Sequence, residues 1–274
     1  MIDDSRVRAD DWGQDGVDSD VPNVARMYDY YLGGLHNFPA DREMAQRVLG
    51  AYPALPAVLQ HNRAFLRRSV RYMVRQGVRQ FLDLGSGLPS VGNTHEIAQA
   101  EAPDAKVVYV DSDPTAVLHS RLMLVGNPGA TVLQLDLRQP QHVLGHRDLR
   151  WQIDLSQPVG VLCIAVVHFI GDAEDPAGIM KAYGDALVPG SYMAISSGSG
   201  DQDPEGARRV MELYARTGSP MHFRSRDEIK ALFGEFELVE PGLVFPADWH
   251  PEFADGPLPE VANISGYVGL ARKP

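Results

Sequence analysis

The sequence has one cysteine, no long apolar run and fewer basic than acidic residues. The single cysteine, Cys163, excludes an intramolecular disulfide, so the fold does not depend on an oxidising compartment. Because Cys163 lies inside the apolar run 161–167, we expect a small buried side chain rather than an exposed nucleophile. No apolar run approaches the ~20 residues that span a bilayer, and residues 1–20 are acidic and polar rather than signal-like, which predicts a cytoplasmic protein.

The shortage of basic residues also limits the partners. With 25 Lys and Arg against 36 Asp and Glu, the formal net charge is −11. A field of that sign repels phosphate backbones and anionic lipids, so we expect neither a nucleic-acid nor a membrane partner. One basic cluster is present, in which arginines recur at spacings of three and four that favour the solvated face of a helix over a binding patch: Arg63, Arg67, Arg68, Arg71 and Arg75.

The chain divides into three segments of different composition. Residues 1–21 are polar and acidic, which predicts a flexible arm. Residues 22–77 predict a cap of three helices, and residues 78–274 predict an α/β core. Neither an internal repeat nor a low-complexity linker separates cap from core, so we expect residues 22–274 to form a single domain. The cap helices are expected at 22–32, 41–49 and 56–76.

From Gln80 onwards, short apolar runs alternate with amphipathic ones, as in parallel sheets whose strands are joined by helices. Helices are expected at 175–187, 204–217 and 229–233, the last after a capping box at Ser225 to Glu228. Strands are expected at 80–84, 106–110, 131–135, 159–167, 192–196, 236–240 and 264–271. The pattern predicts an α/β fold with a doubly wound, mostly parallel seven-stranded sheet and an N-terminal helical cap.

The segment Gly85–Ser90 is a glycine-containing loop between a strand and a helix. Glycines there let the backbone approach a ligand closely. Asp111 ends the next strand, ~20 residues further on, where a carboxylate can accept hydrogen bonds from ribose hydroxyls. Asp136 ends the third strand, where a carboxylate can accept from an adenine amine. Because these three places share one edge of the sheet, they predict an adenosine site.

Two features of the loop favour S-adenosylmethionine over a dinucleotide. A dinucleotide fingerprint requires glycine or alanine where Ser90 stands, and Pro89 lacks an amide that a pyrophosphate would use. Asp83 adds a negative charge that suits an ammonium or sulfonium group and repels pyrophosphate. No spacing of His, Cys and acidic residues predicts a metal site.

The chain resembles class I, Rossmann-like methyltransferases, and more specifically an actinobacterial group of S-adenosylmethionine-dependent methyltransferases once known only as a domain of unknown function (DUF574). The resemblance runs from Pro22 onwards, through motifs at 25–34, 37–42, 62–66, 80–93, 108–114 and 165–170. It implies that Asp83, Gly85 and Gly87 line the methionine side of the cofactor. It also implies that Asp111 with Ser112 holds the ribose, and that Asp136 with Leu137 flanks adenine. The usual third glycine of the loop would fall at Pro89, so Gly92 or Asn93 is an alternative point of close approach.

The segment Arg26 to Asn37 is rich in tyrosine and ends a helix at paired glycines. It is interpreted either as a packing helix or as a lid over the cofactor, in which Arg26 and Tyr31 bind cofactor and Tyr28, Tyr31 or His36 lies beside the methyl group.

His168 follows the fourth strand, and is either a general base or a histidine bonded to the backbone.

Three functions stay open: methyl transfer to a small-molecule acceptor, non-catalytic binding or sensing of S-adenosylmethionine, and NAD-dependent oxidoreduction.

Overall fold

A seven-stranded sheet forms the centre of the protein, seen in a computed structural model that describes residues 18–90, 92–253, 256–260 and 265–274. The strand order is β3-β2-β1-β4-β5-β7-β6. Strands β1 to β5 pair in parallel, whereas β7 pairs antiparallel with both β5 and β6. The strands are β1 Gln80–Leu84, β2 Lys106–Asp111, β3 Ala130–Gln134, β4 Gly160–Ile164, β5 Tyr192–Ser197, β6 Glu237–Leu238 and β7 Tyr267–Arg272.

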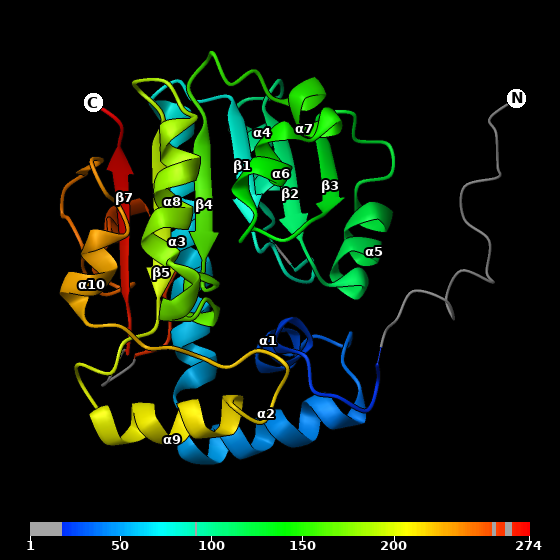
Figure 1. Cartoon of the computed structure of the whole chain (residues 1–274), viewed down its shortest axis with the longest axis vertical. Coiled ribbons are helices and arrows are strands. Elements are labelled where there is room, and N and C mark those ends of the chain that lie inside the picture. The colour runs from blue at the N-terminus through cyan, green and yellow to red at the C-terminus, as the bar shows by residue number, and fades with distance from the viewer. Residues whose placement is uncertain (1–17, 91, 254–255, 261–264) are drawn as a thin grey trace, which may run out of the picture.

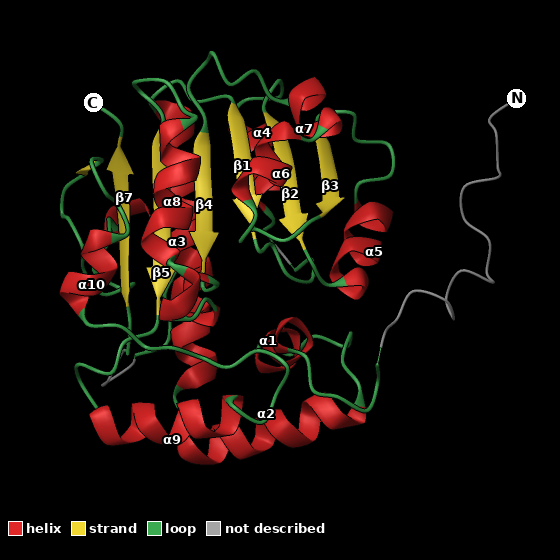
Figure 2. Cartoon of the chain, viewed as in Figure 1, coloured by secondary structure: helices red, strands yellow, loops and turns green. Residues whose placement is uncertain are grey.

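Helices cover both faces of this sheet and extend beyond the carboxyl ends of its parallel strands (Figure 1, Figure 2). They are α1 Val24–Tyr31, α2 Pro39–Ala51, α3 Leu55–Arg75, α4 Thr94–Glu101, α5 Pro114–Met123, α6 Pro140–Gly145, α7 Arg147–Gln152, α8 Pro176–Asp185, α9 Pro204–Tyr214 and α10 Arg226–Ala231. Short 3₁₀ turns occupy Val167–Phe169, Asp172–Glu174 and Pro251–Phe253.

Alternate residues of each parallel strand belong to two separate hydrophobic clusters, because successive side chains point to opposite faces. Phe81 in β1 packs with side chains of α3, α4 and α5, whereas its neighbour Leu82 packs with side chains of α6, α7 and α8. Both residues are fully buried. The sheet is therefore doubly wound, as the sequence predicts.

The cap lies across the carboxyl ends of the parallel strands (Figure 1). It consists of α1, α2 and the distant helix α9, which share a third hydrophobic cluster around Met27 and Tyr214. Helix α3 leaves this cap and continues along one face of the sheet (Figure 1). The cap is thus not purely N-terminal: α9, predicted only as a connecting helix, supplies one of its walls.

The predicted strands agree with the structure in number and order, and differ at their ends. Strand β4 ends at Ile164 rather than 167, because Ala165 has a positive φ of 56° and a 3₁₀ turn follows. Strand β6 is shorter than predicted, and β7 begins at Tyr267. Ile264 and residues 1–17 of the predicted arm lie outside the described residues. The assignment of 22–274 to one domain stays a prediction.

Candidate functional site

A cavity of about 550 Å³ lies between the carboxyl ends of the parallel strands and the cap. A volume of this size is typical of small-molecule sites. Ten of the eleven predicted site residues line it: Tyr28, Tyr31, Asp83, Gly85, Gly87, Asp111, Ser112, Asp136, Leu137 and His168. The structure thus gathers residues from four strand ends and from the first cap helix around one space.

Gly85 and Gly87 adopt the left-handed conformation, with φ of 67° and 65°. A Cβ on Gly85 would lie 2.3 Å from Cγ2 of Val166, so this position has no room for a side chain. The amide of Gly87 donates a hydrogen bond of 2.7 Å to Oδ2 of Asp111. The loop therefore turns sharply after β1 and is tied to the end of β2.

Asp111 is held by backbone amides on both carboxylate oxygens. Besides the hydrogen bond from Gly87 to Oδ2, its Oδ1 accepts a hydrogen bond of 2.9 Å from the amide of Asp113. Burial nevertheless raises the pKa of Asp111 to about 6. Each carboxylate oxygen keeps a second lone pair for a ligand hydroxyl.

Asp83, at the end of β1, is the second buried carboxylate of the cavity. Its side chain is 7% exposed, and Oδ2 accepts 2.7 Å from Oγ1 of Thr94. Burial raises the pKa of Asp83 to about 6, while Thr94 and the charge of Arg63 act in the opposite direction. A carboxylate so poorly hydrated is stabilised by a cationic ligand group.

Asp136 is paired with an arginine that the sequence reasoning did not single out. Arg138 Nη2 lies 2.7 Å from Asp136, and Arg138 Nη1 lies 2.7 Å from Glu174. Although burial acts in the opposite direction, hydrogen bonds from Arg138 hold the pKa of Asp136 below its ordinary value. The carbonyl of Leu137 accepts 2.8 Å from the hydroxyl of Tyr183. This corner of the cavity is therefore rigid and polar.

The tyrosines of the cap line the cavity on the side that faces the strand ends. The hydroxyl of Tyr28 accepts a hydrogen bond of 3.1 Å from Nδ2 of Asn62. The hydroxyls of Tyr31 and Tyr214 lie 3.3 Å apart. Burial raises the pKa of all three tyrosines. They are therefore neutral phenols at physiological pH, which donate hydrogen bonds or present their faces.

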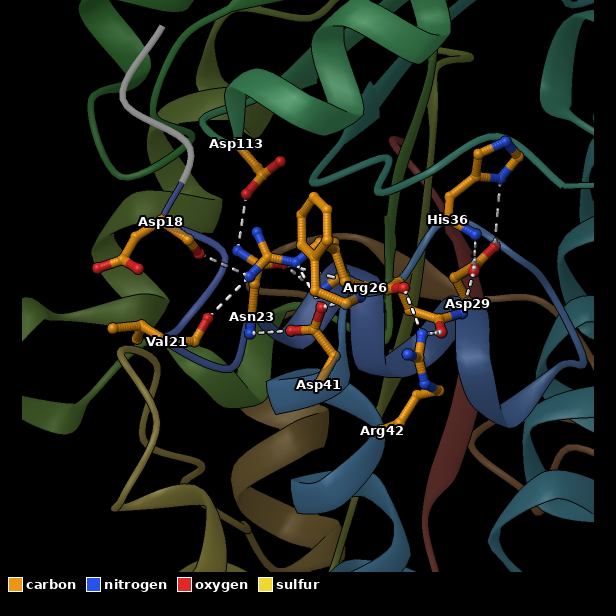
Figure 3. A network of polar contacts seen from close by, with 12 residues as sticks. Asp18, Val21, Asn23, Arg26, Asp29, His36, Asp41, Arg42 and Asp113 are labelled. Atoms are coloured by element: carbon orange, nitrogen blue, oxygen red, sulfur yellow. Dashed lines mark hydrogen bonds and ion pairs between the residues drawn. The ribbon is translucent and has the colours of Figure 1, made fainter. Parts of the chain in front are cut away.

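Arg26 is the one predicted cofactor contact that the structure does not bring to the cavity lining. It is 3% exposed, its Nε lies 2.7 Å from Oδ2 of Asp41, and its Nη2 donates to the carbonyl of Val21 (Figure 3). Nearby, Nδ2 of Asn23 donates 2.7 Å to Asp113 at the start of α5. Arg26 therefore holds the cap together, and Asn23 joins the cap to the core.

His36 also lies outside the cavity lining, contrary to its suggested place beside the methyl group. Its backbone amide donates a hydrogen bond of 2.8 Å to Oδ2 of Asp29 (Figure 3). Its ring lies 4.3 Å from that of His119 in α5. The ring of His36 is thus turned toward α5.

His168 lines the cavity, but its Nδ1 is already engaged. The amide of Gly198 donates 3.2 Å to Nδ1, which assigns the proton of the neutral ring to Nε2. Burial, reinforced by the charge of Arg224, lowers the pKa of His168 to about 3. Of the two interpretations of His168, this geometry favours the backbone-bonded histidine over the general base.

Some parts of the lining were not identified from the sequence, and one was given another role. The first is the segment 210–223, which adds Val210, Tyr214, Met221 and Phe223. The second is Ala165, whose positive φ marks a strained turn at the end of β4. The third is the arginine cluster on α3: Arg63 lines the cavity, and Arg68 is 2% exposed and donates to the carbonyl of Pro246. The solvated-face interpretation is wrong for these two.

The described residues also bear on metal binding and on membrane spanning. Among the described residues, no group of three or more His, Cys, Asp and Glu side chains is arranged to hold a metal ion. No helix in the described part of the chain is both long and apolar enough to cross a membrane.

The doubly wound sheet, its glycine turn and its paired acidic strand ends define a protein of the Rossmann-like methyltransferase class. The family model of S-adenosyl methyltransferases matches residues 10–274, so the chain belongs to the S-adenosyl methyltransferase family, whose methyl donor is S-adenosylmethionine. This confirms the resemblance stated above.

Solved structures agree with this family. A candidate methyltransferase from Thermobifida fusca YX is 38% identical, covers 96% of this chain and 98% of its own, and superposes with a TM-score of 0.88. A DUF574 family protein from Streptomyces avermitilis MA-4680 is also 38% identical, covers 94% and 99%, and gives a TM-score of 0.88. The plantazolicin methyltransferase BpumL, solved with S-adenosylhomocysteine, shares the fold at 11% identity, with 91% and 95% coverage and a TM-score of 0.50. No curated protein matches the chain.

Proposed function

We propose that the protein transfers the methyl group of S-adenosylmethionine to a small, uncharged and largely apolar acceptor bound beneath the cap. The observation that carries this proposal is the continuity of the cavity. One space runs from the glycine loop and Asp111 to the aromatic wall made by Tyr28, Tyr31 and Tyr214. Donor and acceptor can therefore lie side by side, away from bulk solvent.

The donor half of the cavity fits S-adenosylmethionine in its chemistry. Asp111 keeps acceptor capacity for two hydroxyl groups, and Asp83 offers a poorly hydrated carboxylate to a cation. Asp136 and Leu137 lie at the neighbouring strand end, where the adenine is proposed to bind. Bound there, S-adenosylmethionine supplies a methyl group already activated on a sulfonium.

The acceptor half is bounded by apolar and aromatic groups. Between residues 210 and 223, and between 246 and 268, none of the described lining residues is Asp, Glu, Lys or Arg. The ring of Phe169 lies 5.9 Å from that of Tyr214, and Phe223 lines the same cavity. A charged acceptor would lose hydration without gaining a partner, so an uncharged acceptor is favoured.

Catalysis by this chain then consists mainly of alignment. The walls exclude water and hold an acceptor atom in line with the methyl group, at about 3 Å, as near-attack geometry requires. Tyrosine faces beside the methyl group attract a sulfonium by about 0.5–2 kcal/mol. Because Nδ1 of His168 is occupied and Tyr28 is a neutral phenol, Tyr28 is the remaining candidate for a hydrogen-bond donor to the acceptor rather than for a base.

The test is a labelled-methyl transfer assay on a cell extract separated into small-molecule and macromolecular fractions. We expect label in the small-molecule fraction with the wild-type protein, and none with Asp111→Ala, which loses a carboxylate of the donor half. Label on protein or nucleic acid would overturn the small-molecule acceptor. Binding without any transfer would favour the sensing module.

Calorimetric titration separates the remaining alternative. S-adenosylmethionine and S-adenosylhomocysteine are expected to bind and NAD is not; binding of NAD alone would favour the oxidoreductase and overturn the proposal. The proposal includes a cytoplasmic location.

A further inference from the structure

Arg63 is a charged residue of the cavity that no part of the proposed function uses. It belongs to α3, which passes from the cap to the sheet, and it lines the cavity, as Gly85 and Ser86 do. Its Nη2 donates 2.9 Å to the carbonyl of Gly92, in the segment that follows the glycine turn. This bond holds the guanidinium next to the loop.

Two polar atoms of residues that line the cavity have no hydrogen-bond partner among the described residues. They are Nε of Arg63 and Oγ of Ser86, and both are buried. Buried donors are nearly always satisfied in folded proteins, because an unmade hydrogen bond costs free energy. An unpaired guanidinium N–H in a ligand-sized cavity is therefore available to a ligand that accepts hydrogen bonds there.

The charges around Arg63 specify which ligand. Asp83 lines the same end of the cavity, and the positive charge of Arg63 acts on its carboxylate. In the described part of the chain, however, the two side chains form no direct ion pair within 4.0 Å, so neither neutralises the other. A cationic and an anionic side chain held near each other without contact match a ligand that carries both charges.

We propose that Arg63 binds the α-carboxylate of the methionine moiety of S-adenosylmethionine, opposite Asp83, which binds the α-ammonium, so that the cavity recognises the cofactor by its zwitterionic end. This inference rests on the proposed function. Ser86 Oγ is the second donor available to the same carboxylate. Arginine suits this role because its fork can present two N–H groups to one carboxylate, which a lysine cannot.

The test measures affinity rather than turnover, with ligands that differ only at the amino-acid end. S-adenosylmethionine is compared with its decarboxylated form, and S-adenosylhomocysteine with methylthioadenosine, which lacks the whole amino-acid end. Calorimetric Kd values are taken for the wild type, Arg63→Met and Arg63→Lys. The control Arg75→Met removes an arginine from the same helix where it is half exposed and pairs with Glu101.

We expect Arg63→Met to weaken both carboxylate-bearing ligands by about 10–100-fold, as for the loss of a charged hydrogen bond. The decarboxylated form and methylthioadenosine should bind as tightly as to the wild type, which also shows that the variant is folded. Arg63→Lys should lie between, and Arg75→Met should change nothing.

An equal loss for all four ligands would overturn the inference, since Arg63 would then support the loop rather than bind the carboxylate. A wild type that binds S-adenosylmethionine no better than its decarboxylated form would also overturn it. Failure of the wild type to bind any of the four would instead refute the proposed function itself, and the inference with it.

Discussion

Replacing Asp83 with asparagine should stabilise the empty protein while weakening cofactor binding. The carboxylate is 7% exposed, and burial raises its pKa from the ordinary 3.8 to about 6. A shift of that size corresponds to about 3 kcal/mol of lost stability at neutral pH, as an upper limit. Asparagine removes the charge, keeps the volume and can still accept the hydrogen bond from Thr94.

The pH dependence of the stability gain shows whether the ionised carboxylate of Asp83 causes it. Because the pKa of Asp83 is higher in the folded than in the unfolded protein, the folded state binds the proton more tightly. The cost of the ionised carboxylate is therefore fully present above pH 6 and disappears as the pH falls toward 3.8. The gain from Asp83→Asn should be about 3 kcal/mol at pH 7.5 and about 1 kcal/mol at pH 4.5.

Chemical denaturation and calorimetry at these two pH values measure the effect. At pH 7.5 the gain corresponds to a Tm increase on the order of 5–10 °C. Asp104→Asn is the matched control, because Asp104 is 78% exposed and pairs with Arg79 only at 3.7 Å; it should change stability by less than about 0.5 kcal/mol. A stability gain that is absent at pH 7.5, or equal at both pH values, refutes the reasoning.

Three further outcomes follow from the site. Gly85→Ala should cost about 1–3 kcal/mol in denaturation and lower cofactor affinity in a titration, because the position has positive φ and no room for a Cβ. His168→Asn, which can still accept from Gly198, should keep turnover within about tenfold; a loss beyond about 10²-fold would restore the general-base role. Arg26→Met should cost about 3–5 kcal/mol in the same denaturation assay, because the buried carboxylate of Asp41 loses its cation and keeps only its backbone amide donors.

The core of the fold and the donor half of the site could be predicted because their signals are local. Strand β1 is buried along its whole length and is bounded by Gly77 and Gly85, so its ends match the prediction residue for residue. Parallel strands align their carboxyl ends, so Asp83, Asp111 and Asp136 necessarily approach one another once the strands are known.

The acceptor half could not be predicted because its contacts join distant parts of the chain. Tyr31 and Tyr214 meet across 183 residues, and no local pattern reports that contact. The arginines of α3 show a second limit. Arg68 is 2% exposed and Arg75 half exposed although both lie on one helix, because a long side chain can bury its stem while its charge reaches a distant partner.

Asp83 lowers the stability of the empty protein, and Arg63 has an unpaired Nε. Both features arise because the two side chains line one cavity with little access to water. An uncharged residue in place of Asp83 would stabilise the empty protein, because this carboxylate is kept from water without a cation in contact, whereas Arg63 keeps its bond to Gly92 and only its Nε lacks a partner. The same low hydration strengthens their attraction for the ammonium and carboxylate of a zwitterion. Variants of Asp83 should therefore separate stability from binding: stability rises where affinity for the amino-acid end falls.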